Sequence, residues 1–242
     1  PLHSWTLRSL TPTELALVLP DSKEHLWQSQ LDFSLELPVG WELEWIQPKA
    51  SLISNSAYPF GENDGAIWAG KGLTAVFEGG GVLRYGLLHL RLAPEASWSE
   101  NEYFDLADNG YSQSAAYWDD LHPGTIDRPQ RFGEEAYVRM GLGSSALHIA
   151  LPGVSVGLSG AAQQWGPALN YPLLLGQNAG GFLHAFGQTS SPVDLWVGHL
   201  NARYIVGWPT QSDLSPVQLA GGSRFITAAV ISLTPRGLNG FE

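Results

Sequence analysis

Residues 154–159 read Val-Ser-Val-Gly-Leu-Ser, and apolar and small polar side chains alternate without exception along this stretch. Successive side chains of a β-strand point to opposite faces of the sheet. A period of two therefore places Val154, Val156 and Leu158 on one face and the two serines and the glycine on the other. The stretch predicts a strand with one apolar face.

Other segments have the same extended character. The predicted strands cover residues 41–46, 73–77, 81–92, 146–151, 193–206 and 224–233. The run Gly79-Gly80-Gly81 predicts a tight turn or a bulge. The run 81–92 has about a dozen residues, which is long for a soluble strand but suits a tilted membrane-spanning strand. No repeat of fixed period is present, so we expect one all-β domain over residues 1–242.

Only the amino-terminal part carries helix signals. Thr11-Pro12-Thr13-Glu14 supplies an N-cap residue, a proline at the first helical position and an acidic first turn. This pattern predicts a short helix at about residues 12–18.

Composition excludes several classes of protein. With 12 Lys and Arg against 23 Asp and Glu, the formal net charge is −11, and a nucleic-acid binder would need a basic face. The absence of cysteine excludes a disulfide framework, an iron–sulfur site and a cysteine-based zinc site. Charged residues make up only 14%, and residues 140–193 contain none. Proline and glycine interrupt this uncharged segment too often for a membrane-spanning helix, so we expect short strands there.

Aromatic residues make up 11% of the chain, and several tryptophans lie near predicted strand ends, namely Trp41, Trp45, Trp68, Trp165 and Trp208. Aromatic girdles at the two interfaces of a membrane barrel would have this distribution. The core of a soluble β-sandwich would also be rich in Trp and Tyr. The two interpretations differ in what the apolar side chains of residues 154–158 face, which is lipid in a barrel and a second sheet in a sandwich.

Five blocks of sequence carry a resemblance to a known family. In chain order they are Asn55-Ser-Ala-Tyr-Pro-Phe-Gly-Glu-Asn-Asp-Gly-Ala-Ile-Trp-Ala-Gly-Lys-Gly-Leu73, Leu90-Arg-Leu-Ala-Pro-Glu95, Ile126-Asp-Arg-Pro-Gln-Arg-Phe-Gly133, Gln164-Trp-Gly-Pro167 and Leu173-Leu-Leu-Gly-Gln-Asn-Ala-Gly-Gly-Phe182. In content and order they resemble blocks of the Wzi-type capsule assembly proteins. Two positions depart from the family pattern: Gly176 stands where the family usually has Ser, and Leu183 where it usually has Pro.

The resemblance implies an antiparallel up-and-down β-barrel in the outer membrane of a Gram-negative-type bacterium. Such a protein binds or organises capsular or extracellular polysaccharide at the cell surface and is not an enzyme. Residues 1–30, approximately, would form a periplasmic N-terminal segment. We count about eight to ten candidate strands, fewer than in the family barrel, and lipid does not tolerate open strand edges. We therefore expect a partial barrel, either a fragment or one whose edges another protein chain closes.

The family-like blocks contain seven candidate sugar-binding residues, namely Asn55, Asp64, Trp68, Asp127, Arg131, Trp165 and Asn178. Aromatic faces stack on sugar rings, and carboxylate, amide and guanidinium groups form hydrogen bonds with hydroxyls. The same residues also suit structural roles, with Arg131 and Asp127 as an ion pair and Asn178 in a turn. We favour the structural roles because the blocks lie at predicted turns, where backbone groups need partners.

Catalytic and metal-binding patterns are weak. The adjacent carboxylates of residues 119–120 and 134–135 would point to opposite faces of a strand, so neither pair is expected to form a glycosidase site. The oxygen-rich turns 62–65 and 105–110 lack the full spacing of a calcium loop. His184 and His199 would approach across a hairpin without a third ligand. We predict no catalytic residue, metal or cofactor. A soluble carbohydrate-binding β module and a structural subunit of a surface assembly remain as alternatives.

Overall fold

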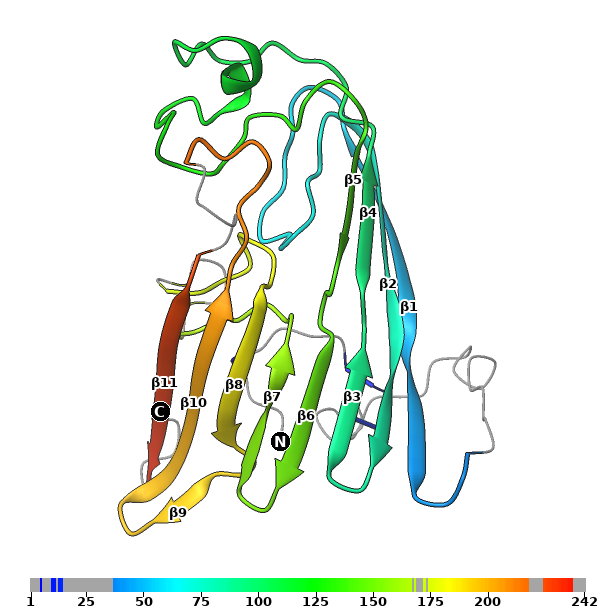
Figure 1. Ribbon diagram of the computed structural model, residues 1–242, viewed down its shortest axis with the longest axis vertical. Coiled ribbons are helices and arrows are strands. Elements are labelled where there is room, and N and C mark those ends of the chain that lie inside the picture. The colour runs from blue at the N-terminus through cyan, green and yellow to red at the C-terminus, as the bar shows by residue number, and fades with distance from the viewer. Residues whose placement is uncertain are drawn as a thin grey trace.

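The computed structural model describes residues 37–166, 168, 172, 174–217 and 224–236, together with residues 5, 10, 11, 13 and 14. They form an all-β structure built on one antiparallel sheet (Figure 1). Its eleven strands are β1 (Trp41–Asn55), β2 (Gly72–Tyr85), β3 (Leu88–Leu92), β4 (Glu95–Ser99), β5 (Tyr137–Gly141), β6 (Ala146–Leu151), β7 (Val154–Ser159), β8 (Leu183–Thr189), β9 (Val193–Leu195), β10 (Gly198–Trp208) and β11 (Ile226–Pro235). A 3-10 helix, η1 (Gln113–Tyr117), lies in the loop after β4.

The order of positions across the sheet follows the order of the chain, although some positions hold two short strands end to end. β3 and β4 share one position beside β2, and β5 and β6 share the next position. β8 and β9 likewise both pair with β10. The positions therefore run in order from β1 to β11 with every pair antiparallel, as an up-and-down meander.

The sheet is open. Among the described residues, β1 pairs only with β2, and β11 pairs only with β10. These two strands stand at opposite sides of the sheet in Figure 1. The all-β antiparallel prediction is confirmed, whereas the described strands do not close into a barrel.

One side of the sheet, which we call the apolar face, carries Leu147, Ile149 and Leu151 of β6 opposite Leu158, Val156 and Val154 of β7. All six side chains are between 42% and 47% exposed. Other strands add large exposed residues to this face, including Trp45, Phe77, Trp98, Met140, Tyr204 and Ile231. No Asp, Glu, Lys or Arg of the described strands projects on this face. Within the described residues no second sheet covers it, which a sandwich would require.

The opposite side, which we call the polar face, carries the charged and hydroxyl side chains of the same strands. Its members include Arg84, His89, Arg91, His148, Ser155 and Arg203. Apart from the register shift between Ile46 and Lys49 of β1, the strands thus separate their side chains by the period of two that the sequence predicted.

Aromatic side chains lie at both ends of the apolar face. Trp41 stacks on Tyr85 with ring centroids 4.6 Å apart, beside the short turn between β2 and β3. At the other end of the sheet, Trp208 is the last residue of β10, and its ring centroid lies 6.4 Å from that of Phe225. Trp165 belongs to neither end of the apolar face, because it is only 3% exposed and packs with Trp5 and Ile205.

The glycine run Gly79-Gly80-Gly81 does not form the predicted turn; of the two predicted alternatives the bulge fits better, because the register of β1 with β2 shifts between Ile46 and Lys49, opposite this run. It lies within β2, whose pairing with β1 continues on both sides of the run. A Cβ on Gly80 would lie 1.8 Å from the carbonyl oxygen of Leu92. The glycine is therefore needed for close approach of two backbones and not for reversal of the chain.

Two predicted long strands are each hairpins. Residues 81–92 are divided by a turn at Gly86, which has a φ of +55°, so the chain reverses between β2 and β3. Residues 193–206 are divided between β9 and β10, and Gly198 begins the second strand. In both segments a short turn interrupts an apolar run that periodicity alone cannot divide.

The described N-terminal residues contact the polar face. Thr11 and Glu14 form the reciprocal contacts of a helix capping box, with Glu14 N donating to Thr11 Oγ1 (3.3 Å) and Thr11 N donating to Glu14 Oε2 (3.0 Å). Glu14 also pairs with Arg91 on β3 at 2.8 Å. The predicted helix at 12–18 and the predicted segment 1–30 otherwise lie outside the described residues. No helix of the described chain is long and apolar enough to cross a membrane.

Candidate functional site

The long connections 56–71 and 100–136 gather at one end of the sheet, whereas two-residue turns join β2 to β3 and β6 to β7 at the other end (Figure 1). Between these long loops lies a cavity of about 480 Å³, which we call the loop cleft. Its walls combine the exposed rings of Tyr58 and Phe60 and the buried ring of Phe104 with polar side chains, among them Asp120, Arg128 and Asn178.

The loop 56–71 is folded around the amide of Asn55 at the end of β1. Asn55 Nδ2 donates to the carbonyl oxygens of Phe60 (3.0 Å) and Ala69 (2.9 Å), which lie at the two ends of the loop. One side chain thus holds the loop closed, which is a contact of the structural kind that the sequence analysis favoured. Tyr58 and Phe60 remain 63% and 72% exposed at the rim of the cleft.

Both carboxylates of the Asp119-Asp120 pair reach the loop cleft. The expectation that they point to opposite faces is wrong, because this segment is a loop and not a strand. Arg128 pairs with both of them, through Nε to Asp119 and through Nη2 to Asp120 at 3.2 Å. The guanidinium therefore joins two carboxylates that backbone alternation would have separated.

Asp119 is held as a carboxylate. Burial would raise its pKa, but hydrogen bonds from the backbone N–H of His122 (2.7 Å) and from Arg128 outweigh burial, and the pKa of Asp119 is lowered. A carboxylate with a lowered pKa does not donate a proton near neutral pH, so Asp119 is unsuited to act as a general acid.

Arg131 and Asp127 do not form the ion pair that the sequence suggested. Arg131 is 5% exposed, and its Nη2 donates to the carbonyl oxygens of Asn101 (2.7 Å) and Glu134 (3.2 Å). Asp127 instead accepts a hydrogen bond from the backbone N–H of Ser212 (2.7 Å). Both side chains fasten loops around the cleft, and the sequence could not reveal their partners because these contacts link distant segments.

Three of the seven candidate residues line the loop cleft: Asp64, Trp68 and Asn178. Trp68 packs edge-on against Phe132 with centroids 5.1 Å apart, so part of its ring is used in packing. Trp165 lies elsewhere, in the core cluster with Trp5 and Ile205. The structure therefore divides the candidates into cleft residues, loop supports and one core residue.

Among the described residues, no group of three or more His, Asp or Glu side chains lies close enough together to hold a metal ion. His184 and His199 do not approach each other across a hairpin. The strand register places His184 opposite Gly207, near the loop end of β10, and His199 opposite Asp194 at the other end.

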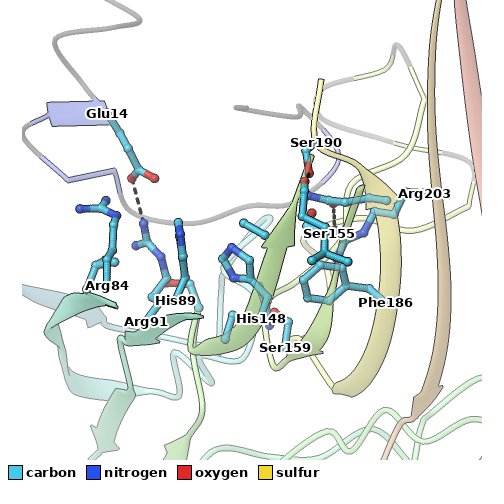
Figure 2. Close-up of a pocket in the computed structure, with 17 residues that line it drawn as sticks. Glu14, Arg84, His89, Arg91, His148, Ser155, Ser159, Phe186, Ser190 and Arg203 are labelled. Carbon is cyan, nitrogen blue, oxygen red and sulfur yellow. Dashed lines mark hydrogen bonds and ion pairs between the residues drawn. The ribbon is translucent and has the colours of Figure 1, made fainter. Parts of the chain in front are cut away.

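A second cavity, which the sequence did not predict, lies on the polar face (Figure 2). It encloses about 350 Å³, and strands β2, β3, β6, β7, β8 and β10 contribute to it, together with Glu14. We call it the polar-face pocket. The sequence did contain one sign of a polar face: in Leu-His-Leu-Arg-Leu of residues 88–92, polar side chains alternate with leucines. The pocket itself could not be predicted, because the order of the strands brings residues of six strands together.

No protein-family model, curated protein or solved structure matches this chain.

Proposed function

We propose that this protein lies in an outer membrane, where its strands belong to a β-barrel, and that it binds or organises capsular or other extracellular polysaccharide without catalysis. The observation that carries the proposal is the apolar face, which is uncharged on every described strand and exposes large side chains throughout.

Water is a poor solvent for such a face. Soluble monomers rarely expose contiguous apolar patches of more than a few hundred Å². Here half-exposed Leu, Ile and Val side chains continue from strand to strand, with Trp and Tyr at the strand ends. Lipid hydrocarbon accepts such a surface, because the sheet already pairs its backbone N–H and C=O groups.

The open edges of β1 and β11 have to be paired in lipid, since each unpaired backbone group there costs several kcal/mol. We propose that further strands or another protein chain pair with these edges and complete the barrel. The meander order supports this arrangement, because an up-and-down sheet closes by pairing its first and last strands.

The loop cleft suits a polysaccharide. Tyr58 and Phe60 offer exposed ring faces for stacking on sugar rings, and Asp120, Arg128 and Asn178 supply donors and acceptors for hydroxyls. The resemblance of residues 55–73 and 126–133 to capsule assembly proteins supports a capsular ligand, because both blocks border this cleft. The lowered pKa of Asp119 supports binding over acid catalysis.

The membrane location is tested by purifying the chain with and without detergent. We expect a monodisperse species with β-sheet circular dichroism only in detergent or phospholipid vesicles. A monodisperse, folded protein in plain buffer would overturn the membrane proposal and favour a soluble carbohydrate-binding module.

Polysaccharide binding is tested by calorimetric titration of the detergent-solubilised chain with purified capsular polysaccharides. Phe60→Ala should weaken binding by about fivefold, since aromatic stacking contributes on the order of 1 kcal/mol. Trp196→Ala is the matched control, because Trp196 is 90% exposed in the turn between β9 and β10, at the opposite end of the sheet from the loop cleft. Equal affinities of the two variants would contradict the assignment to the cleft.

A further inference from the structure

The floor of the polar-face pocket is a row of rings that crosses four strands. His89 of β3 lies 4.8 Å from His148 of β6, and His148 lies 6.2 Å from Phe186 of β8 (Figure 2). Gly157 of β7 stands between the last two rings in the register, and a Cβ there would lie 2.5 Å from Cβ of His148. The missing side chain lets the row continue across β7.

Three arginines surround this floor, and two of them have carboxylate partners. Arg84 pairs with Glu44 at 3.1 Å, and Arg91 pairs with Glu14 at 2.8 Å. Both arginines lie at the end of the row formed by β2 and β3 (Figure 2). At this end of the pocket the positive charge is balanced by carboxylates.

Arg203, at the other end of the row, is different. It is only 4% exposed, and its described contacts are the amide oxygen of Gln188, Nε2 of His184 (3.2 Å) and the face of the Phe186 ring (4.4 Å). Nδ1 of His184 lies 2.8 Å from the carbonyl oxygen of Phe182, which can only accept. His184 therefore donates through Nδ1 and accepts from Arg203 through Nε2, which makes it the neutral tautomer.

No carboxylate of the described residues pairs with Arg203, and its Nε has no hydrogen-bond partner among them. Its partners among the described residues are a neutral amide, a neutral imidazole and an aromatic ring. A buried cation is costly unless an anion balances it. The pocket thus has a place for negative charge beside Arg203, and Ser155 and Ser159 line the same space.

We propose that the polar-face pocket binds an oxyanion group, carboxylate or phosphate, carried by a small polar molecule of about the size of one sugar unit. The Arg203 guanidinium pairs with the oxyanion, the row of rings packs against the body of the molecule, and Ser155 forms a hydrogen bond with one of its hydroxyls. The Glu14 carboxylate, at the Arg91 end, is an internal competitor for the same positive field. This site is separate from the loop cleft and does not depend on the polysaccharide proposal.

The test is calorimetric titration of the folded full chain, in detergent if it requires detergent, with three probes: glucuronate, inorganic phosphate and glucose. We expect at least one oxyanion to bind with a dissociation constant in the millimolar range or below, and glucose to bind at least about tenfold more weakly. Tighter binding of glucuronate assigns a carboxylate ligand, and tighter binding of phosphate assigns a phosphorylated one. Equal binding of all three probes, or binding of none, overturns the proposal.

Two variants locate the site. Arg203→Gln should weaken oxyanion binding by at least about tenfold, since a charge-assisted hydrogen bond contributes more than a neutral one. Arg224→Gln is its control, because Arg224 is an exposed arginine outside the pocket. An equal effect of the two substitutions would refute the assignment to Arg203.

Glu14→Gln provides a test that does not depend on the folding of the buried Arg203 variant. Glutamine keeps the capping contact to Thr11 but removes the competing charge. Oxyanion affinity should rise by about threefold, in keeping with the modest energy of a partly exposed ion pair. Unchanged or weaker binding would overturn the competitor role of Glu14. Failure of any of these titrations leaves the detergent requirement and the polysaccharide affinity unaffected, so the two proposals fail separately.

Discussion

An arginine placed on the apolar face distinguishes a lipid-facing surface from a water-facing one. Val156 lies in the middle of β7, and Val154 lies at its start beside a short turn. The two side chains are 42% and 46% exposed on the same face, so their burial is matched. Along a strand the two positions differ by about 7 Å, since two residues rise about 3.4 Å each.

In a membrane this difference in depth changes the free energy of unfolding. Arginine on the lipid face of a barrel costs about 2–4 kcal/mol near the midplane and about 0–1 kcal/mol near the interface. Val156 lies deeper than Val154, so Val156→Arg should cost about 1 kcal/mol more than Val154→Arg. On a water-exposed face both substitutions would stay within about 0.5 kcal/mol.

The measurement is urea unfolding of the two variants and the wild type in phospholipid vesicles, followed by tryptophan fluorescence. A clear difference between the variants supports a lipid-facing surface. Equal free energies for all three proteins would refute the reasoning, because depth could then have no effect.

Three further predictions concern the loops and the close backbone contacts. Asp119→Asn should lower the free energy of unfolding by about 1–2 kcal/mol at neutral pH, a value reduced because Arg128 is partly exposed. The pKa of Asp119 is lowered in the folded protein, so the difference in free energy of unfolding between wild type and variant should be complete above the usual pKa of about 4. This difference should disappear as the pH falls through the lower pKa of the folded state. Urea titrations at several pH values measure it. Gly181→Ala should lower the free energy of unfolding, measured by urea titration, by about 1–3 kcal/mol, because the added Cβ would lie 2.0 Å from a backbone oxygen. Gly187→Ala is the control. Its Cβ would meet only one methyl group, at 3.8 Å, so it should change the free energy of unfolding by less than about 0.5 kcal/mol. Asn55→Ala should destabilise the protein by about 1–3 kcal/mol, because the carbonyl oxygens of Phe60 and Ala69 lose their hydrogen-bond donor. Amide hydrogen exchange in residues 56–71 should also become faster. Unchanged exchange would show that Asn55 does not hold the loop.

Sequence patterns predicted the strands best where alternation was strict. The bounds of β6 and β7 agree with the predicted 146–151 and 154–159. The pattern failed at glycines, because a glycine that permits close backbone approach and one that permits a turn have the same sequence signature. Gly80 is of the first kind and Gly86 of the second, and the difference depends on which strand lies beside each of them.

The tertiary structure separates the candidate residues of the sequence into different places. Residues 55–73 do border the loop cleft, but Trp165 is a core residue and Arg131 is fixed by carbonyl oxygens. The pairing of Asp119 and Asp120 with one arginine was missed, because the sequence suggested strand geometry where the chain forms a loop.

The amino-acid sequence by itself determined the chemistry of the two faces of the sheet. Charge is excluded from every second position of the strands, and this separation follows from the local geometry of an extended chain. Only the tertiary structure decided which residues meet. Strand order and register bring Arg91, His148 and Arg203 around one pocket, and loop folding joins Asp127 to Ser212. These contacts depend on pairings between segments far apart in the chain, which local periodicity does not specify.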